Sequence, residues 1–198
     1  MSELLTPPPF LVGDRVYLRQ LCLEDTTTLW NWINSSEVTI HLSVVFPITL
    51  KKETEFVESA IAEYDKQFPT KFIFGICLKE TNELIGTMNL SSVHWVHRTA
   101  TTGAFIGSEE HRNNGLGREA KHLLLKYGFR SLGLRKVSSG AKAVNERSLR
   151  YQASNGYKVV GHQREHFLVD GNFVDLVLTE VFPSDWEESY QEWLQRAE

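Results

Sequence analysis

The chain has 198 residues, 41% of them hydrophobic, which is enough for one folded core. Its formal net charge is −4 and its Lys and Arg residues are scattered along the chain, so nothing favours nucleic acid as a ligand. Two cysteines, Cys22 and Cys77, indicate neither a disulfide framework nor a zinc site, and no stretch has the pattern of a membrane span or a signal peptide, so we expect a cytoplasmic protein.

Residues 1–107 predict strands and helices in mixed order. Residues 1–12, with three consecutive prolines, are expected to be an extended, loosely held lead-in. Periodicity and turn residues then predict strands over 15–21, 71–79, 83–90 and 101–107, and helices from Glu24 through Trp32 and over about 50–66. His94 and His97 flank Trp95 in what looks superficially like a metal or stacking site. Because further ligands are lacking, we expect a hairpin edge there.

The stretch Arg112-Asn113-Asn114-Gly115-Leu116-Gly117 precedes an amphipathic helical pattern. Apolar residues recur there at three- and four-residue intervals, at Leu116, Ala120, Leu123, Leu124 and Tyr127. The helix should therefore begin at the glycines, where free backbone N–H groups and the helix dipole can bind a diphosphate. A nucleotide-triphosphate loop is excluded, because Arg118 and Glu119 stand where a lysine and a hydroxyl are needed, and a dinucleotide fold would want a third glycine. A turn that simply caps a surface helix remains the alternative.

A second helix is predicted between Asn145, a helix N-cap, and Gly156, a residue that ends helices. Asn145, Ser148 and Gln152 share one stripe of this helix, while Leu149 and Ala153 lie on the adjoining side that faces the core. A polar stripe beside the core suggests a ligand.

Asp170-Gly171 predicts a two-residue hairpin turn, which makes Val169 face Asn172 and sets His166 opposite Asp175. The face of this pair also holds His162 and Arg164, and the other face is expected to be the core side, with Phe167, Val169, Val174, Leu176 and Leu178. The pair is either a surface contact or an imidazole that is oriented by a carboxylate and acts as a base for an amine.

With these motifs in this order, the chain resembles the GNAT superfamily of acetyl-CoA-dependent N-acetyltransferases. The match to its Arg/Gln-x-x-Gly-x-Gly/Ala signature is Arg112 through Gly117. Asn145 and Ser148 leading to Gly156-Tyr157, and Asp170-Gly171 leading to Asp175, are similar to the ribosomal-protein N-terminal acetyltransferase branch. The resemblance implies an α+β fold over residues 13–183, a mostly antiparallel mixed sheet of about seven strands flanked by helices, followed by a helical tail over 184–198.

The resemblance also implies acetyl-CoA as co-substrate, no metal, and a set of coenzyme contacts. The backbone of Phe105, Ile106 and Gly107 would receive the pantetheine arm as though it were an added strand. The remaining coenzyme contacts would come from Arg112, Asn113, Asn114, Gly115, Leu116, Gly117, Arg118 and Asn145. For Asn145, simple helix capping is the alternative.

Direct acetyl transfer needs a neutral amine and a proton for the departing thiolate. In relatives a tyrosine seven positions after the Asn commonly gives this proton, but here that position is Gln152, so Ser148 is the candidate donor, directly or through water. The glutamate that many relatives place before the loop is replaced by residues 101–103, which carry no carboxylate. Neutralising an amine of pKa near 8 at pH 7 costs only about 1.4 kcal/mol, against about 4 for a lysine-like amine, so a weak base suffices for the first.

This cost mildly favours a peptide N-terminus, an amino acid or an amino sugar as acceptor over a polyamine. Trp95 and Asp175 are the candidate contacts to this acceptor, and a homodimer is compatible with the chain. Two other classes stay open. One is a degenerate fold that binds acetyl-CoA or a partner without catalysis, and the other is an interaction module that uses Trp30, Trp32, Trp186 and Trp193.

Overall fold

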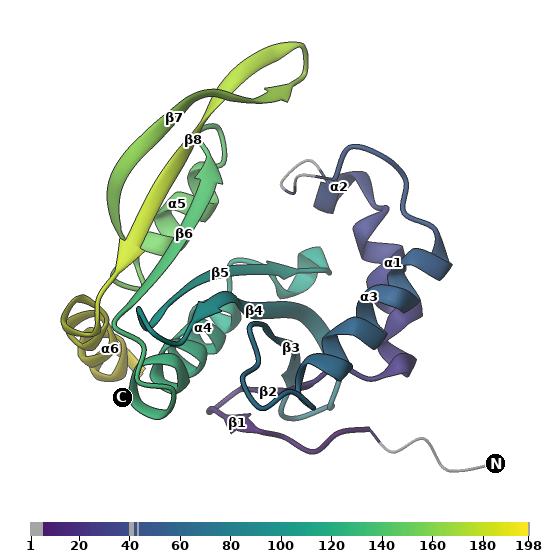
Figure 1. Ribbon diagram of the computed structural model, residues 1–198, viewed down its shortest axis with the longest axis horizontal. Coiled ribbons are helices and arrows are strands. Elements are labelled where there is room, and N and C mark those ends of the chain that lie inside the picture. Colours follow the sequence, from purple (N-terminus) through teal and green to yellow (C-terminus); the bar gives the residue numbers. More distant parts are fainter. Residues whose placement is uncertain (1–5, 40–41, 43, 198) are drawn as a thin grey trace. The chain divides into compact units, whose positions relative to one another are not determined.

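The computed structural model describes residues 6–39, 42 and 44–197 (Figure 1). The chain forms two compact units, one of residues 1–91 and 103–124 and the other of residues 92–102 and 125–198. Two long strands, β4 (Leu84–His94) and β5 (Thr99–Ile106), run through both units.

The first unit holds the amino-terminal strands and most of the helices. Besides parts of β4 and β5, its strands are β1 (Leu11–Val12), β2 (Val16–Gln20) and β3 (Phe72–Leu78). Its helices are η1 (Leu23–Asp25), α1 (Thr26–Ile33), α2 (Ser36–Thr39), α3 (Leu50–Glu63), η2 (Glu109–His111) and α4, which spans Leu116–Lys126 and ends beyond the unit boundary. Strands β1 to β4 pair antiparallel in sequence order.

The core of the first unit lies between this sheet and the helices α1 and α3. Strand β3 is apolar along most of its length and is buried on both faces, as expected for a central strand. Leu29 of α1 and Val57 of α3 pack with Ile73 of β3 in one buried cluster. Residues 1–5 of the predicted lead-in lie outside the described residues. At Phe10 the lead-in is held more firmly than predicted, because the Phe10 ring stacks on Phe74 at 5.9 Å and its N–H donates to a backbone carbonyl of β2.

The second unit is built on the carboxyl-terminal strands. Its elements are the π-helical turn η3 (Tyr127–Ser131), β6 (Lys136–Lys142), α5 (Glu146–Ala153), β7 (Lys158–Val169), β8 (Asn172–Val181) and α6 (Pro183–Ala197). Strand β6 runs parallel to β5 and antiparallel to β8, which pairs antiparallel with β7. The described residues thus contain eight strands in the order β1-β2-β3-β4-β5-β6-β8-β7, which confirms the predicted mixed, mostly antiparallel sheet.

Helix α6 packs into the second unit through Trp186, which is almost completely buried and lies 5.7 Å from the Phe129 ring. Gly156, in the turn that follows α5, has φ +87°, and a Cβ there would lie 2.5 Å from the Asp185 carbonyl oxygen. Trp186 is therefore part of a core, and this burial speaks against its use in the alternative interaction module.

The β7–β8 hairpin, the long yellow-green pair in Figure 1, corrects the predicted register. Val169 faces Asn172 as expected, but the pairing shifts between Gln163 and Phe167, so that three residues of β7 lie opposite Asp175. Glu165, in the middle of this bulge, has φ +53°. The predicted core side is also wrong, because the residues of β8 that are buried are Val177, Thr179 and Val181.

Both cysteines are free and buried, and burial raises the pKa of Cys22 to about 12. Among the described residues, no helix is long and apolar enough to cross a membrane.

Candidate functional site

Helix α4 begins at Leu116, and the turn before it contains two residues with a left-handed backbone. Asn113 and Gly115 have φ +64° and +85°, and the second of these values favours glycine. The Asn114 side chain accepts a hydrogen bond from the Leu116 N–H at 3.3 Å, so it caps the first helical residue. The predicted start of the helix is confirmed, and the binding of a diphosphate by this loop stays a prediction.

Arg112 connects this loop to the end of β5. Its Nε donates to the Ile106 carbonyl at 3.2 Å and its Nη2 to the Gly107 carbonyl at 2.8 Å, while the Gly107 N–H donates to Ile85. These backbone groups were assigned to pantetheine, and several already have protein partners. Coenzyme contacts at Ile106 and Gly107 stay a prediction that relies on the second lone pair of each carbonyl.

Gly107 is required by packing within the first unit. A Cβ at this position would lie 2.0 Å from the Trp32 indole, whose edge meets the Phe105 ring at 6.1 Å between centroids. Trp32 is thus packed over the end of β5. This packing speaks against a role for Trp32 in contacting a partner protein.

A contact that sequence reasoning missed lies beneath the same loop. Glu119, in the first turn of α4, is 1% exposed and accepts hydrogen bonds from the backbone N–H groups of Asp14, Arg15 and Val16 at 2.7, 2.8 and 3.2 Å. Its other carboxylate oxygen is 3.1 Å from Arg15 Nε. No local signal in the sequence points to this contact, because Glu119 is more than a hundred positions from its partners along the chain.

The polar stripe of α5 is organised by hydrogen bonds within the second unit. Asn145 caps the helix by accepting from the Ser148 N–H at 3.1 Å, so the capping role that was its alternative is observed. Gln152, which is 4% exposed, accepts from the Thr179 hydroxyl through Oε1 and donates through Nε2 to Ser148 Oγ at 3.2 Å and to the Gly140 carbonyl at 3.5 Å.

This arrangement determines what Ser148 can do. Its hydroxyl oxygen accepts a hydrogen bond from Gln152, and among the described residues no acceptor takes its own hydroxyl hydrogen. Ser148 therefore has a proton to donate, as its predicted role requires.

The predicted His166–Asp175 pair does not form. Asp175 accepts a hydrogen bond from the Glu165 N–H at 3.0 Å and lies 3.9 Å from His162 Nδ1, while the His166 ring packs edge-on against Phe167. The bulge in β7 is the reason, because it displaces His166 from the position that simple counting from the turn assigns to it. The idea of an imidazole base oriented by a carboxylate is therefore abandoned for His166.

The β4–β5 turn is a hairpin edge, as predicted. The rings of His94 and His97 stack at 4.2 Å, and His94 Nδ1 accepts a hydrogen bond from the His97 N–H. Trp95 is half-buried in the same turn, and its contact with an acceptor stays a prediction, as does that of Asp175.

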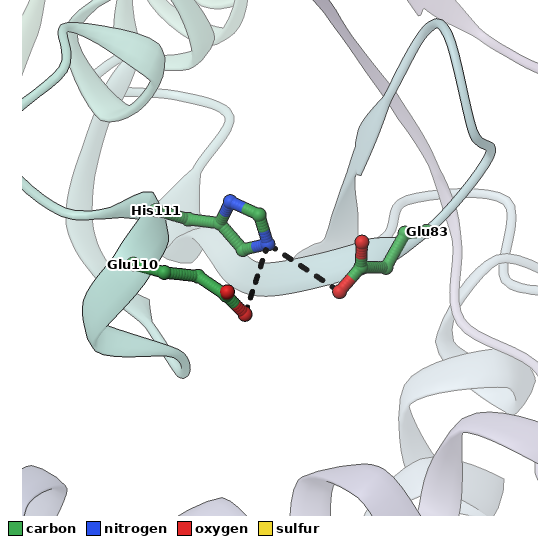
Figure 2. A group of neighbouring side chains, drawn as sticks. All are labelled: Glu83, Glu110 and His111. Atoms are coloured by element: carbon green, nitrogen blue, oxygen red, sulfur yellow. Dashed lines mark hydrogen bonds and ion pairs between the residues drawn. The ribbon is translucent and has the colours of Figure 1, made fainter.

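Figure 2 shows a group with metal-ligating atoms that sequence reasoning did not identify. His111 Nε2 lies 3.4 Å from a carboxylate oxygen of Glu83 and 3.7 Å from one of Glu110. Both carboxylates are largely exposed. We read the group as a surface contact in which the hydrogen bond between His111 and Glu83 joins η2 to the turn before β4.

Comparison with known proteins gives consistent matches. A family profile described as an acetyltransferase (GNAT) domain matches residues 15–158. The chain is similar to an uncharacterised N-acetyltransferase of Bacillus subtilis, at 28% identity over 84% of this chain and 93% of that protein. It is also similar to the ribosomal protein uS5-alanine N-acetyltransferase of Escherichia coli, at 29% identity over 64% of each chain. The structure of spermidine N-acetyltransferase from Vibrio cholerae, in complex with CoA and spermine, shows the same fold, with a TM-score of 0.78 at 21% identity over 88% of this chain and 99% of that chain.

Proposed function

The chain belongs to the acetyltransferase (GNAT) family, and we propose that it transfers the acetyl group of acetyl-CoA directly to a primary amine, with the α-amine of a peptide or protein as the favoured acceptor. The observation that carries the coenzyme assignment is the turn at Asn113 and Gly115 followed at once by α4. Backbone N–H groups at such a helix start favour an anion.

In the proposed reaction, the neutral amine nitrogen attacks the thioester carbonyl carbon. The carbon–sulfur bond then breaks, the amine gives one proton to solvent water, the departing thiolate gains one, and the group that supplied it regains a proton from solvent. Ser148 supplies the second proton directly or through water, because its hydroxyl hydrogen is uncommitted while Gln152 holds its oxygen. Phe105, Arg118 and Asn145 keep their proposed coenzyme contacts.

The cost of deprotonation favours an α-amine as the acceptor. Residues 101–103 of β5 carry no carboxylate to serve as a strong base, and an α-amine loses its proton at neutral pH more readily than a polyamine nitrogen. The similarity to a uS5-alanine N-acetyltransferase supports the same class.

An amine screen tests the proposal. The purified protein is incubated with acetyl-CoA and, separately, with α-amino peptides, free amino acids, amino sugars and spermidine, and release of free thiol is followed together with the product mass. We expect the largest kcat/KM for an α-amine. Preferred acetylation of spermidine would replace the acceptor class, and CoA binding without turnover of any amine would favour the degenerate alternative.

A further inference from the structure

Arg15 is fixed against the loop that precedes α4. Its Nε lies 3.1 Å from the Glu119 carboxylate, and its Nη1 donates to the Asn114 carbonyl at 2.9 Å. The third nitrogen, Nη2, lies 3.0 Å from the position that a Cβ on Gly115 would occupy. The guanidinium group is therefore in contact with the backbone of the turn itself.

The position of this guanidinium group is set by a buried anchor. Glu119 belongs to α4 and its carboxylate is held by three backbone N–H groups, so Arg15 is tied to the first turn of the helix. An arginine side chain has five N–H donors, and the two bonds to Glu119 and Asn114 use two of them. Among the described residues, Nη2 has no protein acceptor.

Arg15 also remains accessible. Its side chain is 52% exposed although its anchor is almost fully buried, so solvent or a ligand can reach the unused donors. A planar guanidinium group that is held at one edge presents its other donors in a fixed direction, which suits the oxygens of a phosphate.

We infer that Arg15 is a phosphate ligand of the coenzyme, in addition to holding the loop. This inference rests on the proposed function. The uncommitted Nη2 would donate to a phosphate oxygen, either of the diphosphate or of the 3′-phosphate, and the bonds from Nε and Nη1 would keep the group in place.

The test compares ligands with and without phosphate. Binding of CoA, 3′-dephospho-CoA and S-acetylpantetheine is measured by calorimetry, or by competition for the weakest ligand, in the wild type, Arg15→Ala and Arg15→Lys. Arg130→Ala is the matched control, because Arg130 is 50% exposed and also pairs with one carboxylate, that of Glu187. Folding of each variant is checked by its thermal transition.

We expect Arg15→Ala to raise the Kd for CoA about tenfold or more, since bonds to a charged group are lost, and to leave the binding of S-acetylpantetheine unchanged. Arg15→Lys keeps the charge and the pairing with Glu119 but not the fork, so its Kd for CoA should rise by a smaller factor. Arg130→Ala should bind every ligand as the wild type does. A defect that disappears with 3′-dephospho-CoA identifies the 3′-phosphate, and one that persists identifies the diphosphate.

Two results would overturn the inference. Either folded Arg15 variants bind CoA as tightly as the wild type, or they lose CoA and S-acetylpantetheine by the same factor, which would make Arg15 a support of the loop alone. Failure of the wild type to bind CoA is a different result, because it removes the proposed function first.

Discussion

The Ser148 hydroxyl accepts one hydrogen bond and can donate its own hydrogen to another group. Gln152 donates to its oxygen and is itself held by Thr179, so the orientation of the amide is set from β8. Replacing the serine hydroxyl removes the proton source for the thiolate without removing any proposed contact to the phosphates. This separation makes the residue testable by kinetics.

We predict that Ser148→Ala lowers kcat by on the order of 10²-fold and leaves the Kd for acetyl-CoA unchanged. Ser154→Ala is the matched control, since that hydroxyl donates to the Tyr151 carbonyl at the end of the same helix and should be neutral for turnover. Steady-state kinetics and calorimetry separate the two parameters. Equal kcat values for both variants would exclude Ser148 as the donor.

Gly115 combines a positive φ with a near neighbour, whereas Gly133 has φ +65° and nothing within 4 Å of an added Cβ. Both alanine variants should lose roughly 1–2 kcal/mol of stability from left-handed backbone strain. Only Gly115→Ala should also weaken CoA binding, because its methyl group meets Arg15 at the turn. Urea unfolding and calorimetry on both variants test this, and similar Kd values would show that the turn does not bind the coenzyme.

At the level of elements, the sequence was most informative where periodicity is strong. The predicted starts of α3, α4 and α5 agree with the structure to within a residue or two, because their apolar spacing and caps are local. Strand β6 was missed, because Ser138-Ser139-Gly140 shows no alternation and its pairing with β5 and β8 is non-local. The β7 bulge was not predicted for a related reason, because counting residues outward from a turn assumes that strand pairing continues without interruption.

In the candidate site, too, the local motifs could be predicted and their distant partners could not. The loop at Gly115 and the stripe of Asn145, Ser148 and Gln152 are readable from short motifs. The partners that orient them are not, because Glu119 contacts Arg15 from 104 positions away and Thr179 contacts Gln152 from 27.

The Glu63 carboxylate makes three hydrogen bonds within the connection between α3 and β3. Glu63 accepts from Lys66 Nζ at 2.7 Å and from the N–H and hydroxyl of Thr70 at 2.7 and 3.0 Å. The bond from Lys66, followed by that from the Thr70 backbone, lowers the pKa of Glu63 to about 2. The unfolded chain therefore takes up this proton first as the pH falls.

The stabilisation by Glu63 should be complete above the ordinary carboxyl pKa of 4.5 and should be lost progressively as the pH falls towards 2. We predict that Glu63→Gln is less stable than the wild type at pH 6 and that this difference shrinks through the acid window. Urea unfolding between pH 6 and pH 2 measures it. Glu55→Gln, which alters an exposed pair with Lys51, is the control. A difference that stays constant with pH would contradict the assignment.

For the whole molecule, the relevant quantity is the free energy that a ligand adds to the folded state. A net charge of −4 supplies no general attraction for a polyanionic coenzyme, so binding must come from local groups such as the α4 amides and the nearby arginines. A ligand that binds only the folded chain stabilises it in proportion to the logarithm of its concentration over Kd.

At a hundredfold excess over Kd, CoA should stabilise the fold by about 2.7 kcal/mol, which corresponds to a rise in Tm of roughly 5–10 °C for a chain of this length. Ser148→Ala should show the same rise, because it keeps every proposed phosphate contact, whereas Arg15→Ala at the same CoA concentration should show less. NAD, which has a diphosphate but no pantetheine, serves as the control and should leave Tm unchanged. Scanning calorimetry makes the comparison. Equal shifts with NAD and CoA would mean that the loop recognises a diphosphate alone, and no shift with CoA would leave the loop at Gly115 without the ligand proposed for it.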